Sequence, residues 1–297
     1  MVLGLILVDG LVYAAWLFTI AVGLTLIFGV MKVLNVAHGA FYAIGAYASA
    51  TAIGIYTTAG LPPAGIYLAM ALAAIVSGLV IGLALERLVL RTLYDKNEII
   101  AVLATYAAFL MIEDALLMIF GRQGIFAYAP YMAAGNLQIG SVVISYYDMG
   151  LICFAGALAL AGWFCLHRTR FGRMLFAVIY SRETAAAFGV NVTRVFILTF
   201  IIGSVLGALG GALTAPKISV APGIGVEVIV IAFAVVAVGG MGSIEGTLIA
   251  ALLVGLCRAA AVHLLPSIEV FIVYLVMAVV LIVRPYGLFT RTGARVI

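Results

Sequence analysis

Charged side chains are scarce in this chain of 297 residues. Asp, Glu, Lys and Arg together make up only 9% of it, whereas 67% of the residues are hydrophobic. A soluble domain is about 25% charged and about 45–50% apolar, so a soluble globular fold is excluded. The net charge of +4 does not indicate a nucleic acid partner, because loop Lys and Arg set the orientation of a membrane protein. The composition predicts a polytopic membrane protein surrounded by lipid.

Lysine and cysteine are rare, and the motifs that they would complete are missing. None of the three lysines follows a glycine, so the chain lacks a P-loop and cannot bind ATP phosphates through one. If ATP drives its activity, another polypeptide must supply the ATPase. The three cysteines fall within apolar segments, which argues against a disulfide framework and metal ligation. Zinc-protease and serine-hydrolase motifs are also absent, so we expect no enzyme activity, cofactor or metal.

Long apolar runs fill most of the chain. A helix needs about 20 apolar residues to cross a bilayer, and residues 10–31 form such a run. No Asp, Glu, Lys or Arg occurs from Val33 to Leu85, which is too long for one span, and Pro62-Pro63 divides it. The segment 226–243 is short and ends in glycines, which indicates a half-spanning or broken helix. The sequence predicts an all-α transmembrane bundle of eight or nine spans near 10–31, 38–58, 64–85, 99–120, 149–166, 195–215, 226–243, 246–264 and 268–283.

Basic residues gather in three segments: the patch at 86–98, the loop at 167–194 and the tail, which carries Arg284, Arg291 and Arg295. Cytoplasmic loops are enriched in Lys and Arg, so we expect all three segments in the cytoplasm. With nine spans they fall on one side, with the amino terminus outside and the carboxyl terminus cytoplasmic. Residues 121–148, rich in Gly, Tyr, Asn, Gln and Ser, are expected to form an ordered external loop.

A polar, glycine-rich stretch at 35–47 interrupts the apolar run. Bilayer hydrocarbon offers no hydrogen bonds to a broken backbone, so such a break must face protein or a wet cavity. A faint repeat recurs at 223–246, and glycine-interrupted segments at matching places in two halves point to a transport site. We therefore predict a translocation pathway for a small solute. Its expected lining residues are Asn35, His38, Gly39, Gly239, Gly240, Gly242 and Ser243.

Three ionisable residues leave other readings open. Glu113 and Asp114 lie within a predicted span, where an acid can couple protonation to transport. They can instead lie near the outer interface and interact with Arg122, about two helical turns further on. His38 has no second metal ligand nearby, so it is expected to serve the pathway, a proton relay or a structural hydrogen bond. The second hypothesis is therefore an ion-coupled carrier or channel for a small polar solute such as urea or an amide, and the third is an intramembrane enzyme.

The basic segment 167–194 is too long for a simple turn between spans. Ser181 precedes Arg182-Glu-Thr-Ala-Ala-Ala187, which predicts a short helix with a serine N-cap that ends at Gly189. A short, rigid cytoplasmic helix can dock on a partner, whereas the simpler interpretation is a plain basic loop.

Four stretches together resemble the first inner-membrane permease subunit of the branched-chain amino acid ABC importers. The first lies early in the chain, where the segment 23–31 leads to Leu34-Asn-Val-Ala-His-Gly39 and then Gly45-Ala-Tyr47. The segment from Phe171-Gly-Arg173 to Gly189-Val-Asn191 resembles the cytoplasmic coupling segment of this family. The remaining matches are Gly239-Gly-Met-Gly-Ser243 with Gly246, and Arg284-Pro-Tyr-Gly-Leu-Phe289.

This resemblance implies that residues 1–297 form a single permease domain in the cell inner membrane. The partners that it implies are a second permease subunit, a paralogue of this one, two cytosolic ATPase subunits and a periplasmic solute-binding protein. The implied function is ATP-driven import of branched-chain or related amino acids. The resemblance also implies that the ATPase contacts the coupling segment, at Arg173, Arg182, Glu183, Ala185, Ala186 and Gly189.

Overall fold

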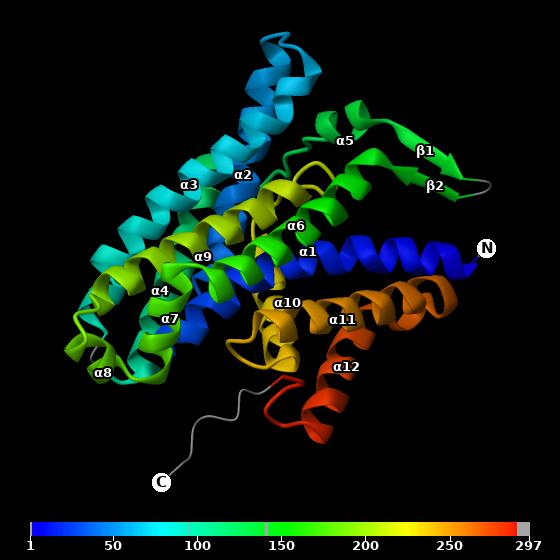
Figure 1. Cartoon of the computed structure of the whole chain (residues 1–297). Helices are drawn as coiled ribbons and strands as arrows, with labels where there is room; N and C mark the ends of the chain where they lie inside the picture. The colour runs from blue at the N-terminus through cyan, green and yellow to red at the C-terminus, as the bar shows by residue number, and fades with distance from the viewer. Residues whose placement is uncertain (1, 95, 140–141, 290–297) are drawn as a thin grey trace.

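A computed structural model describes residues 2–94, 96–139 and 142–289, and helices dominate it (Figure 1). A hairpin of two antiparallel strands, β1 (Asn136–Ile139) and β2 (Val142–Ser145), accompanies the helices. The α-helices of the described ranges are α1 (Val2–Met31), α2 (His38–Thr58), α3 (Ile66–Leu88), α4 (Glu98–Phe120), α5 (Ala129–Ala134), α6 (Tyr146–Arg168), α7 (Arg170–Tyr180), α8 (Arg182–Ala187), α9 (Val192–Thr214), α10 (Ile224–Gly239), α11 (Ile244–Leu264) and α12 (Glu269–Val283).

Each of the nine predicted spans contains a helix, so the all-α bundle is confirmed. Six helical segments among the described residues are long and apolar enough to cross a membrane, and α10 and the 271–283 part of α12 are shorter apolar helices. The start of α1 was predicted too late, at residue 10. The apolar residues before Asp9 continue the helix, and the Asp9 carboxylate finds a partner in His263, at 2.6 Å between Oδ2 and Nε2.

The segment between α4 and α6 is ordered, as predicted, over its described residues. It contains α5 and the β1–β2 hairpin, and it bonds to neighbouring elements. The Tyr67 hydroxyl on α3 donates to the Pro130 carbonyl at 2.8 Å, and Ile125 forms an antiparallel bridge with Val220. Its position outside the cell stays a prediction.

The described parts of the three basic segments lie at one end of the bundle, which we name the basic end (Figure 1). The guanidinium of Arg182, the first residue of α8, donates to the Met31 carbonyl at the end of α1, at 2.7 Å. The Tyr94 ring packs edge-on against Phe196 near the start of α9, 5.1 Å between centroids. Residues 284–289 bond to the last turn of α10. The three segments therefore share one face, as the charge pattern predicted.

One member of the 86–98 patch is not solvated. Glu86 is fully buried, and its Oε1 accepts a hydrogen bond from the Tyr94 hydroxyl at 2.5 Å. Burial, and after it this bond to Glu86, raise the pKa of Tyr94. Asp95, Arg291, Arg295 and the carboxyl terminus lie outside the described residues, so the cytoplasmic tail stays a prediction.

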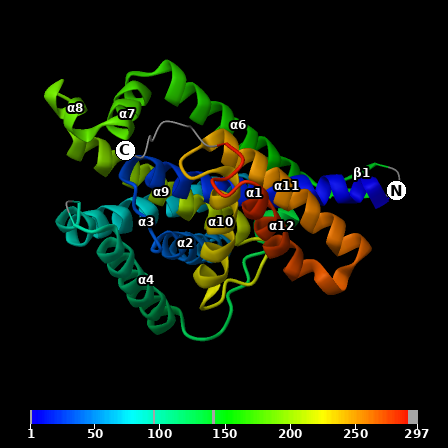
Figure 2. The ribbon, with the colours of Figure 1, turned by 90° about the horizontal axis from the view of Figure 1, so that it is seen from below.

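Two of the helices begin in the interior of the bundle. Residues 32–37 leave the end of α1, where Lys32 has a positive φ of 57°. They return to the level of Ile20, because His38 at the start of α2 bonds to the Ile20 carbonyl. Residues 215–223 likewise separate α9 from α10. Figure 2 shows α2 and α10 in the middle of the bundle, with α4 at its edge.

Helices α1–α4 and α9–α12 pack in matching ways, as the two halves of an inverted repeat do. α1 packs on α9, and the contacts of α1 with α11 and α10 match those of α9 with α3 and α2. The pairs α2–α3 and α10–α11 also match. Because α1 runs toward the basic end and α9 runs away from it, the two halves are oriented in opposite directions relative to the basic end. The weak repeat seen in the sequence thus corresponds to a repeat in the packing.

Reciprocal glycine contacts mark the centre of this repeat. A Cβ at Gly23 would lie 2.7 Å from the Gly203 carbonyl oxygen, and one at Gly203 would lie 2.9 Å from the Gly23 oxygen. The starts of α2 and α10 meet in the same way, because a Cβ at Gly39 would lie 2.5 Å from the Gly225 oxygen. Helices in membranes associate through small residues that let backbones approach. The helix crossings at the centre therefore require glycine.

We expect Gly203→Leu to destabilise the chain, because a side chain there meets the Gly23 backbone and Ile27. Overpacking of this kind costs about 1–3 kcal/mol. Gly156→Leu on α6 is the matched control, since nothing lies within 4 Å of a Cβ at Gly156. Thermal unfolding in detergent should show a lower midpoint for Gly203→Leu alone. Equal midpoints for the two variants would contradict the proposed crossing.

Candidate functional site

His38, the first residue of α2, is fully buried between α1 and α9. Its Nε2 lies 2.9 Å from the Ile20 carbonyl oxygen, so it donates to a carbonyl of α1. Its Cε1 fills the space beside Gly23 and Gly207, where an added Cβ would lie 3.0 Å away. The geometry shows a structural hydrogen bond that fixes the start of α2 against the middle of α1. A role of His38 in the pathway stays a prediction.

Asn35 lies in the break before α2 and is almost fully buried. Neither its Oδ1 nor its Nδ2 has a hydrogen-bond partner among the described residues. The next backbone N–H, of Val36, donates to Thr105 Oγ1 on α4 at 3.3 Å. A buried unpaired polar group costs about 1–3 kcal/mol. A rearrangement of the break that pairs this amide would therefore be favoured.

The second set of predicted pathway residues lies in the turn between α10 and α11, at the basic end. Gly242 packs on Gly29 of α1, and Gly240 packs on the backbone of Phe289. The Ser243 hydroxyl accepts from the Gly246 N–H at 3.0 Å and caps α11. The structure does not bring this turn together with the 35–39 break. The two sets lie at opposite ends of α10.

Glu113 caps the start of α10. Its Oε2 accepts the Gly223 N–H at 3.1 Å, which places a carboxylate at the positive end of the helix dipole. The predicted interaction of the acids with Arg122 is wrong. α4 ends at Phe120 and Gly121 turns the chain with a φ of 77°, so Arg122 leaves the helix and forms no ion pair with a described residue.

The predicted short helix in the coupling segment is present as α8. The Ser181 hydroxyl accepts from the Thr184 N–H at 3.2 Å, and Gly189, with a φ of 81°, follows the end of the helix. Arg182 donates to the Met31 carbonyl and stacks over the Phe196 ring, 4.9 Å from its centroid. This bond ties α8 to the residue before the 32–37 break.

Two positive charges meet at that point. Burial lowers the pKa of Lys32, and the neighbouring Arg182 guanidinium lowers it further. Cations at a helix C-terminus interact favourably with the exposed carbonyls and the helix dipole. At the junction between α1 and α8, the hydrogen bond from Arg182 and the attraction of the cations to the helix end therefore act against the repulsion between Lys32 and Arg182.

The surface of the coupling segment carries two aromatic residues that the sequence reading did not single out. Tyr180 is 74% exposed and Phe188 is 85% exposed. Of the predicted contact residues, Ala185 packs inward, whereas Arg173, Glu183, Ala186 and Gly189 are exposed. The available signal was the position of Phe188, just before the terminating glycine. Exposed apolar groups of this kind mark interaction sites.

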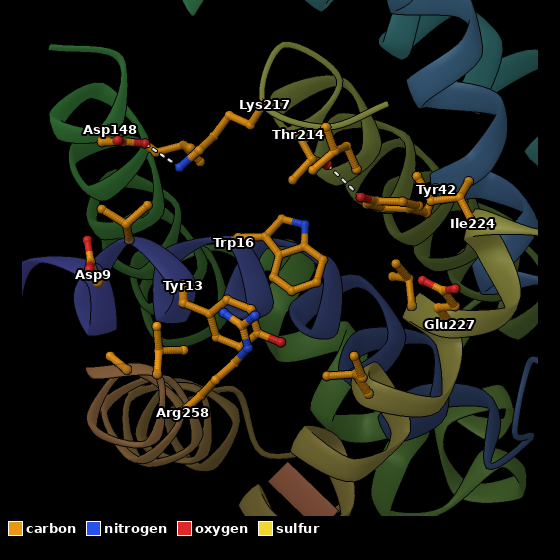
Figure 3. Close-up of a pocket in the computed structure, with 17 residues that line it drawn as sticks. Asp9, Tyr13, Trp16, Tyr42, Asp148, Thr214, Lys217, Ile224, Glu227 and Arg258 are labelled. Atoms are coloured by element: carbon orange, nitrogen blue, oxygen red, sulfur yellow. Dashed lines mark hydrogen bonds and ion pairs between the residues drawn. The ribbon is translucent and has the colours of Figure 1, made fainter. Parts of the chain in front are cut away.

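A cavity of about 540 Å³ opens at the end opposite the basic end (Figure 3). None of the predicted pathway residues lines it. Among its lining residues, the Tyr42 hydroxyl and Thr214 Oγ1 are 2.7 Å apart, and Lys217 pairs with Asp148 at 2.5 Å. Charged residues within apolar spans are functional candidates, so Arg258 in the span 246–264 was the sequence signal for this cavity.

Comparison with known proteins identifies the relatives of this chain. Residues 6–283 match the family described as branched-chain amino acid transport system / permease component. The high-affinity branched-chain amino acid transport system permease protein BraD of Pseudomonas aeruginosa is 27% identical over 96% of this chain and 95% of its own length. LivH of Escherichia coli K12, a permease protein of the same description, is 27% identical over 92% of this chain and 90% of its own length.

A solved structure is also similar. PsaBC from Streptococcus pneumoniae in complex with Fab contains a chain with a TM-score of 0.50 and 13% identity to this one. The similarity covers 97% of this chain and 92% of that one. At this identity it supports the fold alone.

We expect Glu113→Ala to loosen the start of α10, because it removes the carboxylate that accepts the Gly223 N–H. Loss of a cap costs about 0.5–2 kcal/mol. Asp114→Ala is the matched control, because this neighbouring acid is exposed. Hydrogen exchange over the first turn of α10 should rise in Glu113→Ala and stay unchanged in Asp114→Ala. Unchanged exchange in both variants would refute the capping role.

Proposed function

This chain belongs to the permease family of branched-chain amino acid transport systems, and from that premise we propose that it is the permease subunit of an ATP-driven importer. Its solutes are branched-chain or related amino acids. The observation that carries the proposal is the match over residues 6–283, together with relatives that share nearly the whole chain. The chain is a single permease domain in the cell inner membrane, with its basic end in the cytoplasm.

The partners follow from what the chain does not contain. Without a P-loop it needs separate ATPases, and we propose two cytosolic ATPase subunits. A second permease subunit, a paralogue, completes the membrane core, and a periplasmic solute-binding protein supplies affinity for the solute. The permease itself then needs only a passage and a rigid surface on which the ATPase can act.

We propose that α7 and α8 form that surface. The exposed rings of Tyr180 and Phe188 are the apolar contacts, and Arg173 and Glu183 lie on the same segment. Because Arg182 bonds to the Met31 carbonyl, a displacement of α8 reaches the end of α1 directly. The 32–37 break follows directly, and it contains Asn35, whose buried amide has no hydrogen-bond partner within the described ranges. ATPase movement can thus be transmitted to the start of α2.

The geometry of Glu113 does not favour a carrier that acts alone. An acid that couples transport to protons must be free to exchange them, whereas Glu113 is engaged at the start of α10. His38 is likewise enclosed between helices.

The purified chain alone should therefore not accumulate leucine in liposomes under a proton gradient. Liposomes that contain the two permeases and the ATPases, with binding protein and ATP, should accumulate it. The readout is radiolabelled leucine retained in the lumen. Accumulation by the isolated chain would favour the carrier hypothesis.

Two substitutions test the coupling surface. Arg182→Glu removes the bond to Met31, and Phe188→Ala removes the most exposed ring of α8. Each should weaken ATPase binding in pull-down by about thirtyfold, because a buried interface anchor contributes on the order of 2 kcal/mol. ATP-driven uptake should fall in parallel, while membrane insertion is unaffected.

Arg87→Glu on α3 serves as the control, since it reverses an exposed charge at the same end of the bundle. It should capture the ATPase normally. Normal capture by Arg182→Glu and Phe188→Ala as well would show that the ATPase binds elsewhere.

A further inference from the structure

The cavity opposite the basic end has an unequal set of charges. Three acids line it, Asp9, Asp148 and Glu227, but only two bases, Lys217 and Arg258. The ion pairs of the described residues account for most of them. Lys217 pairs with Asp148, Asp9 pairs with His263, and Arg258 pairs with Glu269 on α12. Within the part of the chain that the structure describes, Glu227 is the lining charge without a partner.

Both bases are already engaged by protein groups. Arg258 also stacks over the Tyr13 ring, 4.2 Å from its centroid, in addition to its bond to Glu269. The Lys217 ammonium lies 2.5 Å from Asp148 and 5.9 Å from the centroid of the Tyr131 ring. Both cations that line the cavity in the described part of the chain are therefore paired with acids, which makes them weaker partners for an anionic group than free cations would be.

Glu227, in contrast to the two bases, forms no ion pair with a described residue. It projects from the first turn of α10, and its side chain is exposed. Figure 3 shows Glu227 on one wall, near Tyr42, with the Trp16 ring between it and Arg258 in this view. Tyr42 is fully buried, whereas Trp16 is partly exposed. A carboxylate and a partly exposed aromatic ring in one cavity can bind an organic ammonium, through a charge-assisted hydrogen bond and cation–π attraction.

The remaining wall suits an aliphatic group. Val12, Val228, Ile231 and Val262 present branched side chains to the cavity. Its volume of about 540 Å³ lies within the ~300–1,000 Å³ of small-molecule sites, which combine apolar walls with a few polar groups.

We propose that this cavity is a solute site that binds amino acids by their ammonium group at Glu227, with the aliphatic side chain against α10 and α11. This site recognises the ammonium group of the amino acid and not its carboxylate group. The inference rests on the proposed function for the identity of the solute, but it assigns a site that is separate from the glycine-rich breaks. A primary amine without a carboxylate should therefore bind, and a carboxylic acid without an amine should not.

The two tryptophans of the chain allow a direct test. Trp16 lines the cavity, whereas Trp163 lies on the exposed face of α6. In full-length Trp163→Phe protein in lipid nanodiscs, Trp16 is the sole tryptophan and reports on the cavity. Leucine and 3-methylbutylamine should each change its emission saturably, and 4-methylpentanoate should not do so over the same concentration range.

Glu227→Gln should weaken the binding of leucine and of the amine by about tenfold or more, because it removes a charged hydrogen-bond acceptor. Glu227→Asp keeps the charge and should bind within a few-fold of the unsubstituted protein, which separates loss of charge from loss of folding. Glu98→Gln, an exposed acid in the first turn of α4, is the matched control and should bind normally.

Equal binding of 4-methylpentanoate, or unchanged leucine binding by Glu227→Gln, would overturn the site. Either result leaves the proposed function standing if the assembled importer still accumulates leucine with ATP. Conversely, failure of the assembled complex to import leucine, with binding at Glu227 intact, would refute the proposed function and not the site.

Discussion

The architecture depends on backbone-to-backbone contact at the crossing of α1 with α9. The reciprocal approach of Gly23 and Gly203, repeated by Gly39 and Gly225, lets four backbones meet where side chains would hold them apart. Because the starts of α2 and α10 lie at this crossing, both helices can begin in the interior with neighbours on every side. Nearby acceptors pair with N–H groups at the helix starts. The clearest example is Glu113, which accepts a hydrogen bond from the Gly223 N–H. Without the glycines, the broken helices would expose unpaired peptide groups to hydrocarbon.

Much of this fold could be read from the sequence, because apolar runs and helix caps are local signals. The spans, the short helix after Ser181 and the break before His38 all depend on neighbours within a few residues, and the structure contains them. The start of α1 and the Arg122 interaction were misjudged, since each depended on a distant partner or a turn. Asp9 is tolerated within α1 because His263, far along the chain, pairs with it.

The charges of the cavity show more clearly that contacts between distant residues cannot be predicted from local sequence signals. Its charges are arranged by pairs between different elements, such as Arg258 with Glu269 and Lys217 with Asp148. No spacing rule predicts which acid is left over when these pairs have formed. The sequence predicts a pathway at the glycine-rich breaks, which stays a prediction; in the structure these breaks are closely packed, and the cavity lies at the end of the bundle opposite the basic end.

The inverted repeat is symmetric in its packing but not in its chemistry. The counterparts of α10 and α11 are α2 and α3, and residues 33–85, which hold nearly all of them, contain no Asp, Glu, Lys or Arg. If the two halves exchanged shapes during a transport cycle, the chamber that opened toward the basic end would be neutral where the present one is charged. A solute bound through its charge in the present cavity would meet no equivalent charged side chain in the chamber from which it is released. An uneven distribution of charge over an even scaffold would thus make the affinity for the solute differ between the two ends of the passage.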